Sequence, residues 1–335
     1  MASNLKILAV RFSSLGDIVL TVPLLRKLRE KNPGAVIDYL TKQRYSQFLK
    51  ELNYIDNVIE ARDDINFREL KRLKSVISEN KYDVIYDLHN NLKTLYLKIF
   101  QKSLIRTFRK YSLRKYIYVN LKINLLKNIL PVYKRYLQTG NFYNGFTTEK
   151  FTVNGHNILS EYNIPDEKTI ICIAPVSRHF TKTYPAEYYS RFIEMFDADK
   201  YAFVIVGTAD QKNSAEALNS TNVINLCGKT DLRELMGIIQ KSSLMISGDT
   251  GPMHIAEMLG IPLIMLAGSS VREFGFYPQS ADAVVIEVSN LPCRPCSHIG
   301  RNFCPKNHFR CMKDISPEMI YEKTVKMLKI FNSPN

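Results

Sequence analysis

Short apolar runs alternate along this chain with longer segments in which apolar residues recur every three to four positions. The runs indicate buried strands, and the longer segments indicate amphipathic helices. The expected strands are Lys6–Arg11, Ala35–Leu40, Val58–Ala61, Val84–Leu88, Leu104–Thr107, Thr169–Ala174, Ala202–Val206, Val223–Leu226, Leu244–Ser247, Leu263–Leu266 and Val284–Val288. Because strands that alternate with helices form parallel sheets covered by helices, the pattern predicts an α/β fold.

The predicted helices lie between these strands. They are Ile18–Lys31, Phe67–Asn80, Glu187–Asp197, Asp210–Asn219, Leu232–Lys241, Met253–Leu259 and Pro317–Phe331. The segment Gln138–Asp166 contains three glycines and a proline and has weak periodicity, so we expect the domain linker there. A chain of 335 residues suits two domains of about 150 residues each. We therefore expect two doubly wound parallel-sheet domains facing across a cleft, at residues 1–150 and 167–316, with residues 317–335 as a helix that crosses back to the first domain.

Composition narrows the class of protein. The chain is 45% hydrophobic and 23% charged, which is close to the averages of globular proteins. No stretch approaches the roughly 20 apolar residues that a membrane span needs. The segment Met1–Leu15 enters a strand at once and lacks the layout of a signal peptide. We therefore expect a cytoplasmic protein.

One loop has the composition of a phosphate site. The expected strand Leu244–Ser247 leads into Gly248-Asp249-Thr250-Gly251-Pro252, and a predicted helix follows. Small residues let the backbone approach a ligand closely, and free N–H groups at a helix start attract phosphate. The loop would lie at the carboxyl edge of the sheet, where open α/β sheets bind ligands. A phosphate or diphosphate site is predicted, and a plain helix cap by Asp249 or Thr250 is the alternative.

A similar arrangement occurs near the N-terminus. The expected strand Lys6–Arg11 is followed by Ser13-Ser14-Leu15-Gly16-Asp17 and then by a helical pattern. The loop is neither a G-x-G-x-x-G loop nor a P-loop, because Gly16 stands alone and no Gly-Lys-Ser/Thr follows. The functional interpretation is a carboxylate, Asp17, at the mouth of a cleft. The alternative is that Asp17 only caps the helix.

These segments together resemble the bacterial lipopolysaccharide heptosyltransferases, glycosyltransferase family 9. The residues that resemble the family are Arg11–Pro23, Lys182–Pro185 and Gly248–His254, in the family's order and at about its spacing. The resemblance extends from about Lys6 to Phe331. Tyr184 stands where the family usually has tryptophan, and it can supply the same flat packing surface.

The resemblance implies a GT-B fold and an inverting transfer of heptose from ADP-heptose. The acceptor would be a lipopolysaccharide core or a related glycolipid or glycan. Such a reaction needs a base for the acceptor hydroxyl and a group that stabilises charge on the leaving diphosphate. The resemblance assigns the first task to Asp17 and the second to Lys182, with no catalytic cofactor. Without the resemblance, an ordinary surface lysine would be an equal alternative for Lys182.

Further site residues are expected in both halves. Donor-binding residues are expected at Ser177, Asp210, Lys229, Asp249, Thr250, Gly251 and His254, and acceptor-binding residues at Ser14, Gly16, His89 and Lys93. The loop Leu226–Thr230 could bind adenine and Asp210 the ribose, although Asp210 could equally be a helix cap. His254 is more often satisfied within its own helix. Lys93 replaces the family's usual arginine and lacks its bidentate fork.

The positive charge is unevenly distributed. Residues 88–148 contain twelve lysines and arginines, interleaved with apolar residues and tyrosines, and no Asp or Glu. Such a segment attracts anionic partners. No zinc-finger helix or RNA-binding aromatic strand is present, so we do not expect nucleic acid. An anionic glycolipid acceptor and peripheral binding at the inner membrane surface are expected, with a merely solvated basic face as the alternative.

Four of the six cysteines lie close together in the sequence. Cys293, Cys296, Cys304 and Cys311 have the spacing C-x2-C-x7-C-x6-C. In a cytoplasmic chain this favours a structural zinc ion over disulfides. The alternatives are reduced thiols that pack a loop, or a redox-labile pair.

Two other functions stay open on the sequence. The first is a sugar-nucleotide epimerase or hydrolase of the same fold, for which no further set of acid and base groups is found. The second is a non-catalytic protein that binds the membrane surface, which the presence of Asp17 and Lys182 argues against.

Overall fold

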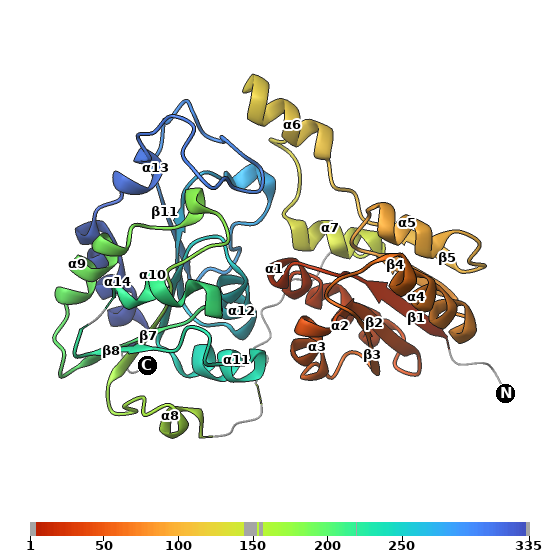
Figure 1. The fold of residues 1–335 in the computed structure, drawn as a ribbon, viewed down its shortest axis with the longest axis horizontal. Coiled ribbons are helices and arrows are strands. Elements are labelled where there is room, and N and C mark those ends of the chain that lie inside the picture. Colours follow the sequence, from red (N-terminus) through yellow and green to blue (C-terminus); the bar gives the residue numbers. More distant parts are fainter. Residues whose placement is uncertain (1–4, 144–152, 154–156, 219, 333–335) are drawn as a thin grey trace. The chain divides into compact units, whose positions relative to one another are not determined.

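The computed structural model describes residues 5–143, 153, 157–218 and 220–332. The chain divides into two compact units (Figure 1). The first unit comprises Met1–Tyr111 and Leu130–Thr147, and the second comprises Ser112–Ile129 and Thr148–Asn335. Much of the expected linker, namely residues 144–152 and 154–156, lies outside the described residues.

The first unit contains a five-stranded parallel sheet in the order β3-β2-β1-β4-β5. The strands are β1 (Lys6–Val10), β2 (Val36–Lys42), β3 (Asn57–Ala61), β4 (Val84–Asp87) and β5 (Leu104–Thr107). The helices are α1 (Leu15–Val19), α2 (Val22–Lys31), α3 (Gln43–Lys50), α4 (Phe67–Asn80), α5 (Leu92–Lys98) and α7 (Val132–Thr139). Residues Ile7–Val10 of the central strand are all buried, as expected of a parallel strand with both faces covered.

The predicted helix Ile18–Lys31 is two helices in the structure. α1 ends at Val19, and α2 begins at Val22 with Thr21 as its N-cap. Pro23 lies in the first turn of α2, where its missing N–H is tolerated. A continuous helix would require an N–H at this position, so the chain restarts instead.

The second unit contains a six-stranded parallel sheet in the order β11-β10-β9-β6-β7-β8. The strands are β6 (Thr169–Ala174), β7 (Tyr201–Ile205), β8 (Val223–Asn225), β9 (Leu244–Ser247), β10 (Leu263–Ala267) and β11 (Ala283–Glu287). The helices are α6 (Ser112–Leu121), α8 (Ile158–Glu161), α9 (Ala186–Glu194), α10 (Lys212–Glu216), α11 (Leu232–Lys241), α12 (Gly251–Leu259), α13 (Arg310–Lys313) and α14 (Pro317–Asn332), with short 3-10 helices η1 (Phe180–Lys182), η2 (Ala209–Gln211) and η3 (Arg272–Phe274).

Two features of the second unit differ from the sequence-based expectation. α14 packs against α9, and Ile320, Met327 and Leu328 of α14 lie in the core of this unit, whereas we expected the helix to cross back to the first domain. The segment Ser112–Ile129, called the arm below, also belongs to the second unit, although its sequence position lies inside the expected first domain. Both differences come from long-range contacts that a local pattern does not encode.

The strand order fixes where ligands can bind. In the first sheet the order reverses between β1 and β4, and in the second it reverses between β6 and β9. Open parallel sheets bind ligands at the carboxyl ends of the strands next to such a reversal. The segments after these four strands contain most of the candidate site residues, whereas Asp210 and Lys229 follow β7 and β8. None of the helices in the described part of the chain combines the length and apolar character of a membrane span.

Candidate active site

Asp17 in the first unit is held by an arginine that follows β1. The Arg11 Nη2 lies 2.8 Å from the Asp17 Oδ2. The same guanidinium donates from Nε to the Ser13 carbonyl at 2.7 Å and from Nη1 to the Leu88 carbonyl at 2.7 Å. Ser14 donates to the Asp17 carboxylate from its backbone N–H at 3.2 Å and from its hydroxyl at 2.7 Å. The carboxylate is therefore fixed directly by Arg11 and Ser14, and Arg11 is held in turn by the Leu88 carbonyl at the end of β4.

The environment of Asp17 keeps its carboxyl group ionised. Burial by itself raises the pKa of Asp17, but the charge of Arg11 and the hydrogen bonds from Ser14 lower it below its ordinary value. The net effect is a lowered pKa. At neutral pH the group is an acceptor of protons, as a general base must be.

Two further polar groups lie near Asp17. Burial and the charges of Arg11 and Lys110 together lower the pKa of His89 to about 3, so the imidazole is neutral. The His89 Nδ1 is buried without a hydrogen-bond partner among the described residues, and its ring packs edge-on against Phe12 at 5.5 Å. Burial also lowers the pKa of Lys110, and Arg11 lowers it further. Neither Arg11 nor Lys110 was among the expected site residues.

The remaining expected acceptor residues have different surroundings. Ser14 uses its hydroxyl on Asp17, and Gly16 is buried within α1. The Lys93 Nζ donates to the Ile65 carbonyl at 2.8 Å, so this ammonium group binds the loop before α4. The structure thus brings Ser14, Gly16 and His89 together around Asp17, while Lys93 is engaged elsewhere in its own unit.

Lys182, Asp249 and His254 form the corresponding cluster of the second unit. The Lys182 Nζ donates to the Asp249 Oδ2 at 2.6 Å, and the His254 Nε2 lies 3.7 Å from the Asp249 Oδ1. The side chains of Lys182 and Asp249 are only 11% and 10% exposed. Burial raises the pKa of Asp249, but Lys182 and His254 lower it more, so the net pKa is well below the ordinary value. Asp249 is therefore an anion at neutral pH.

The backbone of this cluster requires glycine at one position. A Cβ at Gly248 would lie 2.6 Å from the Lys182 carbonyl oxygen, so glycine allows η1 to approach the loop after β9. Thr250 is the N-cap of α12 and accepts from the Met253 N–H at 3.5 Å. The Thr250 hydroxyl also lies 2.7 Å from the Ser247 hydroxyl. The helix begins at Gly251, directly beside the Lys182–Asp249 pair.

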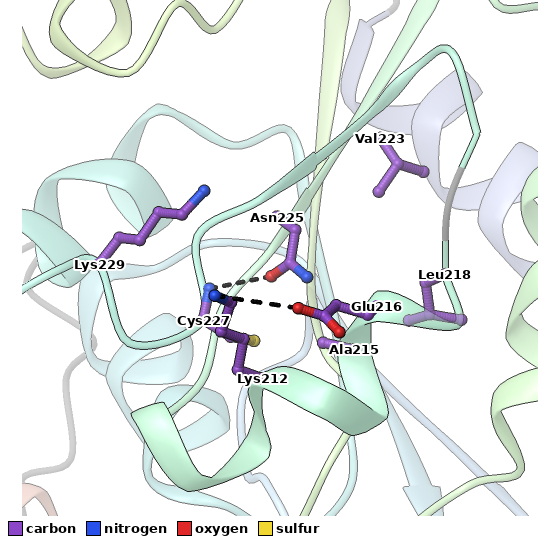
Figure 2. A pocket seen from close by; sticks show the side chains of 8 residues that line it. All are labelled: Lys212, Ala215, Glu216, Leu218, Val223, Asn225, Cys227 and Lys229. Carbon is purple, nitrogen blue, oxygen red and sulfur yellow. Dashed lines mark hydrogen bonds and ion pairs between the residues drawn. The ribbon is translucent and has the colours of Figure 1, made fainter.

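A cavity of about 290 Å³ lies at the end of β8 (Figure 2). Its lining residues are Lys212, Ala215, Glu216, Leu218, Val223, Asn225, Cys227 and Lys229. Gln211 connects the cavity region to the loop after β6, because its Nε2 donates to the Val176 carbonyl at 3.3 Å. The expected residue Lys229 lines this cavity, but Asp210 is exposed in η2 and does not. Ser177 follows Val176, and its N–H donates to the Thr183 hydroxyl at 3.1 Å.

The four clustered cysteines do not form the expected metal site. No group of three or more His, Cys, Asp or Glu residues within the described part of the chain could hold a metal ion. Cys311 lies in the hydrophobic core at α13, where burial raises the pKa of its thiol to about 12. The Cys293 sulfur lies 3.9 Å from the His308 Nε2. The expectation of structural zinc is therefore not met within the described residues.

The sequence indicates a structural or functional role for Arg11, although Arg11 was not among the expected site residues. A charged residue directly after a buried apolar strand is unusual unless a partner compensates its charge. Lys110 had no local signal, since it is one of twelve cations in the basic stretch.

Comparison with known proteins identifies the family. The model of glycosyltransferase family 9 (heptosyltransferase) matches residues 70–306. The chain belongs to this family. It is 24% identical to lipooligosaccharide heptosyltransferase 2 of Haemophilus influenzae, with 97% of this chain and 99% of the relative covered. The expected family and the class of enzyme, a glycosyltransferase, are confirmed.

Solved structures confirm the fold class. The E. coli ADP-heptose lps heptosyltransferase II matches with a TM-score of 0.78 and 20% identity, covering 97% of this chain and 98% of that chain. The E. coli heptosyltransferase WaaC with ADP-2-deoxy-2-fluoro heptose matches with a TM-score of 0.69 and 16% identity, covering 96% and 99%. The chain therefore has the GT-B-like architecture of two parallel-sheet α/β domains.

Proposed function

We propose that this glycosyltransferase transfers heptose, with inversion, from ADP-heptose to a lipopolysaccharide core or a related glycolipid or glycan acceptor. Its family and its full-length relatives, which are named as heptosyltransferases, support the sugar and the acceptor class. The E. coli structure that holds ADP-2-deoxy-2-fluoro heptose supports the nucleotide. The observation that carries the chemistry is an ionised Asp17 clamped by Arg11 at the strand reversal of the first sheet.

In the proposed reaction Asp17 acts as the general base. An acceptor hydroxyl loses its proton to the carboxylate, and its oxygen forms a bond to the anomeric carbon of heptose. The bond from that carbon to the diphosphate oxygen breaks, and ADP leaves with the electron pair. Attack from the face opposite the leaving group inverts the anomeric centre. Ser14, Gly16, His89 and Lys93 are proposed acceptor residues, with Lys110 as an addition from the structure.

The second unit is the proposed donor site. Lys182 neutralises charge on the diphosphate, and the N–H groups at the start of α12, from Gly251 onward, donate to the phosphate oxygens. The His254 Nδ1 is buried and has no hydrogen-bond partner among the described residues, which supports a polar ligand here. Ser177, Asp249 and Thr250 complete the phosphate and sugar contacts. The cavity at Cys227 and Lys229 is the proposed adenine site, and Asp210 lies on the neighbouring loop for the ribose.

We also propose that the first unit binds the inner face of the cytoplasmic membrane through one surface. This surface, the α4–α5 patch, consists of the exposed apolar residues Phe67, Leu92, Leu95, Ile99, Phe100 and Leu104. Two lysines border it, since Lys71 lies over the Phe67 ring at 4.8 Å and Lys74 over the Tyr96 ring at 4.7 Å. Exposed apolar side chains bordered by cations suit an anionic bilayer surface, where a lipid-linked acceptor is held.

A reaction with defined substrates tests the proposal. The protein is incubated with ADP-heptose and a heptose-deficient lipopolysaccharide core, and ADP release and acceptor mass are measured. We expect stoichiometric ADP and an acceptor heavier by one heptose. A parallel calorimetric panel of ADP-, UDP- and GDP-sugars should show preferential binding of ADP-heptose. Conversion of a nucleotide sugar without acceptor would instead indicate an epimerase or hydrolase, and tighter binding of a UDP-sugar would refute the proposed donor.

A further inference from the structure

The arm, Ser112–Ile129, lies in the sequence between the two segments of the first unit but belongs to the second unit. Three hydrogen bonds anchor it there. The Lys122 Nζ donates to the carbonyls of Cys293 at 3.0 Å and Pro295 at 2.6 Å, and the Asn124 amide donates to the Glu273 carboxylate at 2.8 Å. These bonds join residues 149 to 173 positions apart, and they give the arm a defined position on the second unit.

The anchored arm holds Lys115 over two aromatic rings. The Lys115 Nζ lies 5.4 Å from the centre of the Phe276 ring and 5.8 Å from that of Phe274. Phe274 is buried and also packs edge-on against Tyr118 of the arm at 6.1 Å. A cation within about 6 Å of a ring face is attracted to it, so this arrangement fixes the ammonium group.

The same rings connect Lys115 to the donor cluster. The Phe276 ring lies 6.4 Å from the ring of His254, which contacts Asp249. His298 provides an independent link. Partial burial lowers the pKa of its imidazole, and the charges of Lys115 and Lys182 both lower it further. Both ammonium groups are thus within electrostatic reach of one imidazole.

The charge of the donor cluster calls for a second cation. Lys182 and Asp249 form a close pair, and their charges cancel. The diphosphate of a nucleotide sugar carries two negative charges, and a third develops when ADP leaves. A neutral pair cannot balance this charge, whereas a cation next to the pair can.

We propose that Lys115 is a second cationic ligand of the donor diphosphate, which the arm holds beside Lys182. The inference rests on the proposed function, because it assumes that a nucleoside diphosphate binds at Lys182 and α12. It assigns to the donor site a residue that lies, in sequence, among the basic residues expected at the membrane surface.

Calorimetry with ADP and adenosine on the parent protein and three variants tests the inference. Lys115→Met removes the charge and keeps an unbranched apolar stem for the contact with Phe276. Lys127→Met is the matched control, because it removes an exposed cation from the same arm. We expect Lys115→Met to weaken ADP binding by about 10- to 100-fold, the usual cost of a lost charged hydrogen bond. Adenosine binding should be unchanged, and Lys127→Met should resemble the parent.

The outcomes separate this inference from the function on which it rests. Unchanged ADP affinity in Lys115→Met, with a parent protein that binds ADP, would overturn the inference alone. Equal losses for ADP and adenosine would also overturn it, since the change would then reflect the fold of the unit. A parent protein that binds no ADP would refute the proposed function as well. Lys115→Arg keeps the positive charge and should retain most of the ADP affinity. If Lys115→Met unfolds at a lower temperature than the parent, ADP binding by Lys115→Arg still tests the role of the charge.

Discussion

Asp17 and Asp249 each lie beside the reversal of strand order in their own unit, after β1 and β9, yet their partners differ. Each follows a buried strand at the reversal of strand order, and each forms a short ion pair, at 2.8 Å with Arg11 and at 2.6 Å with Lys182. Arg11 is fixed on its other side by two backbone carbonyls, whereas the Asp249 carboxylate lies between Lys182 and His254. In the first unit the cation is therefore held in place, and the carboxylate is the group that we propose to react.

In the second unit the roles are exchanged. Asp249 contacts both Lys182 and His254, and its carboxylate orients the ammonium group of Lys182. We therefore propose that the same type of ion pair serves opposite chemistry in the two units. In one it supplies a base for the acceptor, and in the other a positive group for the leaving diphosphate. Substitutions at the two pairs should affect different steps, which gives the comparison a direct test.

The largest effect is expected from Asp17→Asn. The amide keeps the shape of the carboxylate but cannot take a proton, so kcat should fall by about 10²- to 10⁴-fold. The affinity for ADP, measured by calorimetry, should be unchanged, because we propose that the donor binds in the second unit. Turnover close to that of the parent would remove Asp17 from the role of base.

A smaller effect, on ADP affinity and on kcat/KM, is expected from Lys182→Met. Loss of the ammonium group should weaken ADP binding and lower kcat/KM, each by about 10- to 100-fold, and it leaves Asp249 as an uncompensated anion beside the diphosphate. Because we propose that lysine neutralises the leaving group, EDTA should not reduce the turnover of the parent protein. Activity that EDTA abolishes and Mg²⁺ restores would contradict this assignment, as would a variant with the parent's ADP affinity.

The sequence predicted strands better than it predicted long-range contacts. Buried parallel strands are continuous apolar runs, and for this reason the bounds of β5, β6 and β9 agree with the prediction. The loops with Asp17 and Asp249 were located because they follow such runs. Arg11 contacts a carbonyl 77 residues away, and the arm docks through contacts more than 100 residues apart. No local pattern contains that information.

Arg11→Gln tests the role of the Arg11–Asp17 ion pair in the first unit. Arg11 lowers the pKa of Asp17 against the effect of burial, so its removal should raise that pKa. The acidic limb of the kcat/KM profile should therefore move to higher pH, and kcat at neutral pH should fall by about tenfold as the carboxylate loses its fixed position. Arg11→Lys, which keeps the charge, should return the limb toward that of the parent. A profile that does not move in Arg11→Gln would show that Arg11 serves the fold alone.

The smallest effect on turnover is expected at the α4–α5 patch. Leu92 and Phe100, which are 84% and 93% exposed, are replaced together by serine. Less apolar surface is then available for the bilayer, and binding to phosphatidylglycerol vesicles should fall by about tenfold in a sedimentation assay. Vesicle binding by the parent should weaken as salt rises, because the lysines at the patch are screened.

Kinetic measurements and a control variant separate an effect on membrane binding from an effect on the chemistry of either unit. The double variant should raise the KM for a lipid-linked acceptor by a few-fold, because the substrate is concentrated at the membrane. Neither kcat with a water-soluble acceptor fragment nor ADP affinity should change. Ile330→Ser, which replaces an exposed apolar residue of α14 in the second unit, should bind vesicles like the parent. If both variants lose vesicle binding equally, general surface hydrophobicity accounts for the effect. The first unit would then differ from the second only in its chemistry, and not in its contact with the membrane.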